Sequence, residues 1–227
     1  MHQQWVIPPQ ENGEFVARME DILEVYRRPY DPDVPVICMD EQPVQLLKET
    51  REPIPMARRR PARSDYEYER AGTASVFLFV DALRGWRRVE GKAHRTAVDW
   101  AQQIRQLLEK DYPHVDRVVL VCDNLNTHKL GSLYEAFEPS VARTLASRLE
   151  IHFTPKHGSW LNIAESELSV MTRQCLGTRT PDSQALSRKM RAWTRDRNSR
   201  QCGVTWRFTT QDARIRLRRL YPQPQMT

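Results

Sequence analysis

RVVLVCDN (residues 117–124) is a short apolar run that ends in an Asp-Asn pair, and VPVICMD (residues 34–40) has a similar form. Nearly continuous apolar runs of this length are typical of strands that are covered on both faces of a sheet. Each run leads directly into an aspartate, Asp123 in the first and Asp40 in the second. Ligands and catalytic groups collect where the strands of an open α/β sheet end. The two runs therefore predict a sheet that carries two carboxylates at its strand ends.

Strand and helix patterns alternate along the rest of the chain. Apolar runs bounded by turn residues predict further strands at residues 74–83, 85–91 and 149–155. Apolar residues at helical spacing predict helices at residues 14–28, 96–110, 132–137, 140–147, 160–176, 181–199 and 212–220. Residues 48–70 hold three prolines and a dense charge cluster, which indicates an exposed excursion. This order predicts one mixed α/β sheet flanked by helices.

Composition excludes several classes of protein. Hydrophobic residues make up 40% of the 227 residues, which argues against a disordered chain. No apolar stretch approaches the roughly 18 residues that a membrane span needs, and the N-terminus does not resemble a signal peptide. We therefore expect a cytoplasmic protein with no membrane partner. The four cysteines are scattered and form no C-x-x-C pair; they are Cys38, Cys122, Cys175 and Cys202. Two of them end apolar runs, which suggests small buried core residues rather than disulfides or zinc ligands.

Positive charge is concentrated in the C-terminal third. The net charge of the chain is +6, yet the segment from Arg173 onward holds 13 Lys and Arg against 3 Asp and Glu. This asymmetry is typical of proteins that bind polyanions, although arginine-rich helix faces in solvent would look the same. Two basic clusters are candidate contacts to a DNA backbone or, equally, solvated surface. The first comprises Arg58, Arg59, Arg60 and Arg63, and the second Arg188, Lys189, Arg191, Arg195 and Arg197.

The two aspartates and an acid on the helix at 160–176 form a candidate metal site. Phosphoryl transfer on DNA needs two divalent ions, one to activate the attacking oxygen and one to stabilise the leaving oxygen. A lone aspartate at a strand end is more often a turn or a helix cap, but two of them favour a site. Glu165 and Glu167 flank the apolar face of the helix at similar angles on opposite sides. Helical periodicity alone does not choose between them.

Several long sequence blocks resemble one known family. They occur in order along nearly the whole chain and are CMDEQP (38–43), DYEYERAGTAS (65–75), VCDNLNTH (121–128), TPKHGSWLNIAESELS (154–169), RQCL (173–176) and WRFTTQDARIRLRRLYP (206–222). These blocks closely resemble the insertion-sequence-630 branch of the mariner-like DDE transposases. The resemblance implies a ribonuclease-H-like fold and an Asp-Asp-Glu triad.

The family motifs assign this triad to individual residues. They imply that Asp40, Asp123 and Glu165 are the catalytic and metal-binding residues, because the L-N-x-x-E pattern selects Glu165 over Glu167. The implied cofactor is a pair of Mg²⁺ ions, for which Mn²⁺ can substitute. The implied partners are transposon ends, TA-containing target DNA and a second copy of the chain in a synaptic homodimer. His128 would contact a phosphate or, as its favoured role, make a structural hydrogen bond.

The chain is predicted to have three segments. Residues 1–33 form a linker-like helical segment, 34–200 the catalytic domain and 201–227 a basic extension packed on the core. Full-length relatives carry helix-turn-helix modules upstream, so we expect a catalytic half that lacks sequence-specific end recognition. Two alternatives stay open: a non-catalytic DNA-binding or interfering transposase fragment, and a ribonuclease-H-like nuclease or resolvase that hydrolyses DNA without strand transfer.

Overall fold

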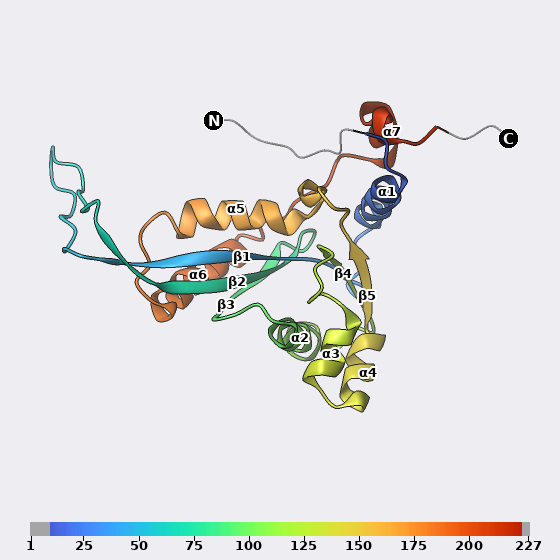
Figure 1. The fold of residues 1–227 in the computed structure, drawn as a ribbon, viewed down its shortest axis with the longest axis horizontal. Coiled ribbons are helices and arrows are strands. Elements are labelled where there is room, and N and C mark those ends of the chain that lie inside the picture. Colours follow the sequence, from blue (N-terminus) through green and yellow to red (C-terminus); the bar gives the residue numbers. More distant parts are fainter. Residues whose placement is uncertain (1–9, 224–227) are drawn as a thin grey trace.

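The computed structural model describes residues 10–223 and contains a mixed five-stranded sheet (Figure 1). The strand order is β3-β2-β1-β4-β5. β1 and β3 each pair antiparallel with β2, whereas β1 and β4, and β4 and β5, run parallel. The bounds are β1 Val36–Glu49, β2 Tyr68–Asp81, β3 Trp86–Lys92, β4 Val118–Cys122 and β5 Leu149–Phe153. This is the mixed sheet that the sequence predicts.

Helices cover both faces of the sheet and create two hydrophobic cores. The first core lies under α1, α5, α6 and α7, and the second lies under α2, the turn η1, α3 and α4. The helix bounds are α1 Gly13–Arg27, α2 Ala97–Gln106, η1 Leu107–Asp111, α3 Leu130–Ala136, α4 Pro139–Ser147, α5 Ile163–Cys175, α6 Ser183–Ser199 and α7 Thr210–Arg216. Two short 3-10 turns, η2 Ser159–Leu161 and η3 Arg218–Leu220, complete the set. Among residues 10–223, no helix is long and apolar enough to cross a membrane.

Alternation along the central strands determines which side chains enter which core. Cys38 of β1 and Val121 of β4 lie in the first core, whereas Met39 and Cys122 lie in the second. Successive side chains of a strand point to opposite faces. The sequence correctly predicts that Cys38 and Cys122 are buried.

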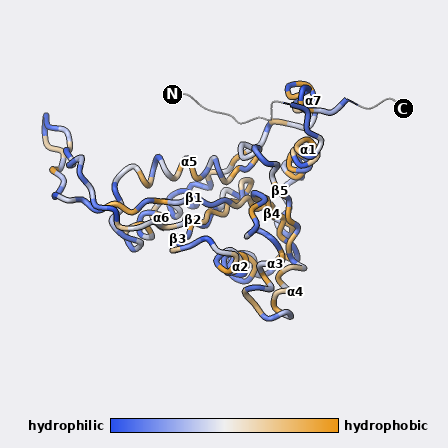
Figure 2. Tube along the Cα trace, viewed as in Figure 1, coloured by the Kyte–Doolittle hydropathy of each residue, from blue (hydrophilic) through white to orange (hydrophobic). Residues whose placement is uncertain are grey.

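The first strand is longer than the sequence predicts. We expected it to end at Asp40, but β1 continues to Glu49 and pairs with β2 as far as Tyr68. The apolar run ends at Asp40 because most side chains beyond it are partly or fully exposed, with Leu46 the buried exception, while the hydrogen-bonded ladder to β2 continues. Residues 50–67 then project as an exposed arm, which is mostly hydrophilic (Figures 1 and 2).

Most helix starts follow from local capping chemistry. Thr96 and Asp99 form a reciprocal capping box at the start of α2, as the placement of Thr96 before the apolar stripe predicts. The predicted helix at 160–176 instead begins with the 3-10 turn η2, and α5 starts only at Ile163. Asn162 separates the two because its side-chain oxygen accepts the Ala164 N–H at 3.0 Å. α5 therefore begins two residues before Glu165.

Candidate active site

Strand register brings Asp40 and Asp123 together. Cys38 of β1 lies opposite Val121 of β4 in the parallel pair, and each aspartate follows its partner by two residues. Adjacent strands lie about 4.8 Å apart, so the two carboxylates lie side by side on the face of the first core. Asp40 lies within β1 and not at its end, so the expectation of two aspartates at strand ends is corrected. Asp40 nevertheless lies beside the end of β4, next to Asp123.

Glu165 reaches the same place because the start of α5 is bound to β1. The Asn162 side-chain amide donates a hydrogen bond to the Met39 carbonyl at 2.9 Å, one residue before Asp40. The Tyr26 hydroxyl of α1 donates to the Leu161 carbonyl at 2.7 Å. Both bonds fix the first turn of α5 over the sheet, so that Glu165 faces the aspartates.

Glu167 has a different environment from Glu165. It is 2% exposed and makes ion pairs with Arg87 of β3 and Arg197 of α6, both at 2.8 Å. Arg87 is itself only 1% exposed. Glu167 is therefore part of a buried ion network that joins α5, α6 and the edge of the sheet. Of the two candidate glutamates, only Glu165 remains available for a site beside Asp40.

The three carboxylates act on one another electrostatically. Burial raises the pKa of Asp40 to about 7, and the nearby carboxylates of Asp123, Glu165 and Glu41 act in the same direction, against a hydrogen bond from the Glu41 N–H. Burial also raises the pKa of Glu165, with a further contribution from Asp123 and an opposing hydrogen bond from Ser159. A buried group of like charges of this kind is stabilised by a bound cation.

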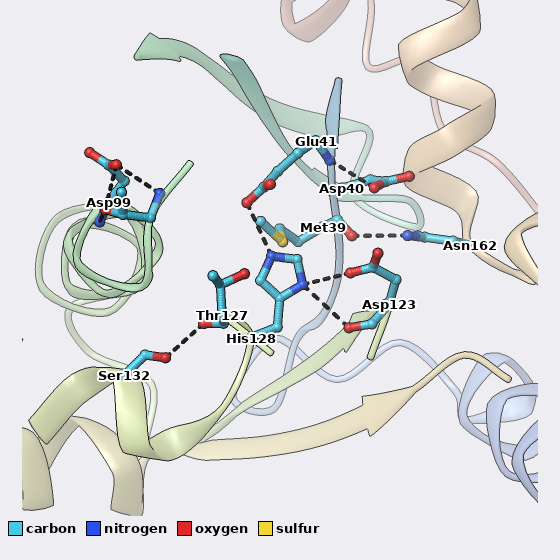
Figure 3. A network of polar contacts seen from close by, with 10 residues as sticks. Met39, Asp40, Glu41, Asp99, Asp123, Thr127, His128, Ser132 and Asn162 are labelled. Carbon is cyan, nitrogen blue, oxygen red and sulfur yellow. Dashed lines mark hydrogen bonds and ion pairs between the residues drawn. The ribbon is translucent and has the colours of Figure 1, made fainter. Parts of the chain in front are cut away.

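Behind the aspartates, His128 bridges two carboxylates (Figure 3). Its Nδ1 lies 2.6 Å from Asp123 Oδ1, and its Nε2 lies 3.0 Å from Glu41 Oε1. The ring is 0% exposed and stacks on Trp100. Burial opposes its ionisation, but its hydrogen bonds to Asp123, Cys122 and Glu41 outweigh burial and raise its pKa well above the usual range. His128 thus makes the structural hydrogen bonds that the sequence favoured, and the phosphate contact was the wrong alternative.

A hollow of about 490 Å³ opens beside Asp123. Its polar lining includes Asn124, Lys156, His157 and Ser159, and α1 contributes Arg18. His157 adopts a left-handed backbone conformation with φ of 66°. Lys156 carries positive charge next to Asp123, whereas the charge of Arg18 is paired with Glu14 of the same lining. The hollow can therefore accept an anionic ligand at the edge of the site.

The donor set suits hard divalent cations. Mg²⁺ takes oxygen ligands and uses one or two carboxylates per ion, with water and substrate oxygens completing its shell. In the described part of the chain, no three or more His, Cys, Asp or Glu side chains are grouped so that they could hold a metal ion. Asp40, Asp123 and Glu165 nevertheless offer the oxygen ligands that Mg²⁺ takes in an open site, where water and substrate supply the other ligands.

The predicted basic contacts lie away from the carboxylates. Arg58, Arg59, Arg60 and Arg63 are exposed on the arm, and Arg188 and Arg191 are exposed on α6. Lys189 is different, because its ammonium donates hydrogen bonds to Thr178, Arg179 and Thr180 in the loop before α6. The ammonium of Lys189 therefore holds this loop, and a contact of Lys189 with DNA stays a prediction.

Sequence reasoning missed several residues that organise the site. Glu41 went unnoticed because its only signal is its position next to Asp40, and its partner His128 is 87 residues away. Asn162 belongs to the L-N-x-x-E pattern, which does not reveal its bond to the Met39 carbonyl. A helix N-cap asparagine has a recognisable signature, whereas the contact across the sheet has none.

Comparisons with solved structures identify the fold. This chain is similar to the catalytic domain of Mos1 mariner transposase, with a TM-score of 0.55 and 13% sequence identity. The alignment covers 87% of this chain and 91% of the Mos1 chain. The Mos1 mariner paired end complexes with Mg and with Mn give TM-scores of 0.57 and 0.56 at 16% identity, covering 98% and 89% of this chain. The chain spans 68% and 62% of those Mos1 chains. The fold is therefore ribonuclease-H-like, as predicted.

Comparisons of sequence identify the family. No curated protein matches the chain at a significant level. The family model described as DDE superfamily endonuclease matches residues 35–187, a range that includes both aspartates and Glu165. Because this match covers well over half of the sequence, the chain belongs to the DDE superfamily of endonucleases.

Proposed function

We propose that this chain is a transposase catalytic core of the insertion-sequence-630 branch, which cleaves DNA and transfers strands with divalent metal ions. The observation that carries this proposal is the convergence of Asp40, Asp123 and Glu165 on one face of the sheet, from three separate elements. Family membership supports an endonuclease. The finer assignment to the branch rests on the sequence blocks around these residues.

In this proposal Asp40, Asp123 and Glu165 hold two Mg²⁺ ions, for which Mn²⁺ can substitute. When bound, such ions activate an attacking oxygen and stabilise the leaving oxygen of a phosphodiester. Asp40 interacts electrostatically with Asp123 and Glu165, and Asp123 also acts on Glu165, so all three carboxylates could contribute ligands. The Mos1 complexes carry Mg and Mn in their descriptions, which is consistent with the same choice of metal here.

The protein's own residues orient the site and bind the DNA strand. His128 holds Asp123 through Nδ1, and Ser159 hydrogen-bonds Glu165, so that both carboxylates are oriented before substrate arrives. Lys156 in the hollow beside Asp123 is placed to neutralise a backbone phosphate. Orientation of this kind keeps the reacting groups in place and lowers the entropic cost of the reaction.

The proposed partners are DNA and a second copy of the chain. Two of the similar Mos1 structures are described as a paired-end complex with the left transposon end and a strand transfer complex. We extend this to transposon ends, a TA-containing target and a synaptic homodimer. The four arginines of the arm, Arg58 to Arg60 and Arg63, are proposed backbone contacts. The division into 1–33, 34–200 and 201–227 stays a prediction, and residues 1–9 and 224–227 lie outside the described residues.

A strand-transfer assay with pre-cut ends tests this function. Wild-type protein with Mg²⁺ or Mn²⁺ should join labelled 3′-ends to target DNA, while Asp40→Asn and Asp123→Asn should not. Asp116→Asn, which alters an exposed aspartate before β4, is the matched control and should retain activity. Equal activity in all four proteins contradicts the triad. Hydrolysis without joined products identifies a nuclease, and DNA binding without either product identifies the interfering fragment.

A further inference from the structure

One face of α6 carries a row of arginines. Arg188, Arg191 and Arg195 are spaced three and four residues apart, so that they stack on one side of the helix. All three are exposed. The opposite side of α6 buries Leu186, Met190 and Trp193. We call Arg188, Arg191 and Arg195 the α6 arginine row.

The α6 arginine row has no acidic partner in the part of the chain that the structure describes. Other cations of this helix do have partners: Arg197 pairs with Glu167 at 2.8 Å and Arg200 pairs with Asp196 at 2.7 Å. Surface arginines without partners are available to an external anion. Their planar forks suit phosphate, which they can bind through two parallel hydrogen bonds.

A groove runs beside this row along β3, the edge strand of the sheet. It consists of two hollows of about 340 and 360 Å³ that share Arg88, Val89 and Arg191. Arg195 lines the first hollow, and Gln106 of α2 lines the second. The groove therefore lies between α6 on one face of the sheet and α2 with η1 on the other. We call it the β3-edge groove.

The charge that this groove offers comes from the α6 arginine row and not from its floor. Arg88 on the floor pairs with Asp111 at 2.7 Å and with Glu90 at 3.5 Å, and it stacks over Phe79. These contacts neutralise Arg88 and hold it in place. Arg191 and Arg195 therefore contribute the unbalanced positive charge on the wall.

We propose that the β3-edge groove and the α6 arginine row bind the phosphate backbone of duplex DNA outside the reacting segment. Arg188 and Arg195 are seven residue steps apart, or about 10 Å along the helix, which matches about three rises of about 3.4 Å along one DNA strand. β2 separates β3 from β1 and β4, so DNA in this groove is held away from Asp40 and Asp123. The contact is independent of sequence and anchors flanking DNA.

This inference rests on the proposed action on DNA, and it specifies where a second stretch of DNA binds. The competing occupant is an acidic protein segment that pairs with the free edge of β3. DNA is favoured because the groups available in the groove are the guanidinium groups of the α6 arginine row. A partner that adds a β-strand would instead need apolar side chains to bury.

The test measures the salt dependence of DNA binding by fluorescence anisotropy in EDTA, with a duplex of about 30 base pairs. The groove variant replaces Arg188, Arg191 and Arg195 by glutamine. The control variant removes the same charge from three exposed arginines elsewhere, Arg95, Arg143 and Arg219. Thermal denaturation of both variants checks that they fold like the wild type.

Loss of three phosphate contacts should reduce the log-log salt slope by about 2.7, at about 0.9 per contact. Between 50 and 200 mM NaCl, wild-type affinity should then fall about 40-fold more than that of the groove variant. The control variant should keep the wild-type slope. Metal-dependent cleavage of a duplex too short to reach the groove should be unchanged in the groove variant.

Three outcomes overturn the inference. A wild-type slope in the groove variant, with cleavage intact, removes the groove and leaves the proposed function standing. An equal loss of slope in both variants shows that net charge alone is measured. Tighter wild-type binding of a polyglutamate peptide than of the duplex identifies an acidic protein as the occupant. Absence of both duplex binding and cleavage in the wild type contradicts the proposed function itself.

Discussion

Replacing Asp40 by asparagine should stabilise the metal-free protein at alkaline pH while it removes DNA cleavage. The substitution preserves shape and keeps an oxygen that can accept the Glu41 N–H, which Asp40 Oδ1 now does at 2.7 Å. It removes only the negative charge. Because that charge is buried among other carboxylates, it lowers the free energy of unfolding whenever no cation is bound.

The size and sign of this effect follow from the pKa of Asp40. Burial raises this pKa from 3.8 to about 7, so the folded state holds the proton more tightly than the unfolded state. The stability that the neutral carboxyl contributes is fully present below pH 3.8 and is lost as the pH rises to about 7. A shift of about three units corresponds to about 4 kcal/mol. Because Asp40 is partly exposed, we expect about 2–4 kcal/mol at pH 8.

Thermal and urea denaturation in EDTA measure this difference. At pH 8 the variant should melt about 5–15 °C above the wild type, given about 2–4 °C per kcal/mol for a domain of this size. At pH 5 the difference in melting temperature between the variant and the wild type should shrink to less than half of its value at pH 8. Added Mn²⁺ should stabilise the wild type and leave the variant nearly unchanged. An Asp40→Asn protein that is no more stable than the wild type at pH 8 would refute the reasoning.

Other substitutions test separate contacts of the same site. Glu167→Ala should cost about 3–5 kcal/mol in urea denaturation, because it leaves Arg87 buried without its partner. Glu165→Gln should instead be at least as stable as the wild type, because burial and Asp123 raise the pKa of Glu165, yet it should lose strand transfer. A destabilised Glu165→Gln protein that still transfers strands would exchange the roles of the two glutamates. His128→Ala should weaken Mn²⁺ binding about 10–100-fold in calorimetry, because Asp123 loses the hydrogen bond that orients it. An unchanged affinity for Mn²⁺ would show that the bond between His128 and Asp123 has only a structural role. Asn162→Ala should cost about 1–2 kcal/mol by removing a helix cap, checked by thermal melting.

The central strands of the fold could be predicted from the sequence, because burial on both faces leaves a recognisable apolar run. Residues 117–124 predict β4 almost to the residue. The end of β1 could not be predicted in this way. Beyond Asp40 the strand is maintained by pairing with β2, and hydrogen bonds between backbones leave little trace in side-chain identity.

The site was predictable where it follows from strand order and not where it depends on distant partners. Asp40 and Asp123 meet because parallel neighbours carry them at equal offsets from Cys38 and Val121. The family pattern implied Glu165 over Glu167, but the physical reason, the ion pair of Glu167 with Arg87, joins residues 80 positions apart and left no local signal. Helical periodicity gives both glutamates similar angles, and only tertiary packing shows which one is already paired.

Anomalous diffraction from crystals soaked in Mn²⁺ tests most directly whether the three carboxylates share metal ions. Mn²⁺ peaks should lie between Asp40 and Asp123, with Glu165 turned toward them, and should vanish in Asp40→Asn crystals. Peaks bound only at other carboxylates, with no manganese beside Asp40 in the wild type, would contradict the account.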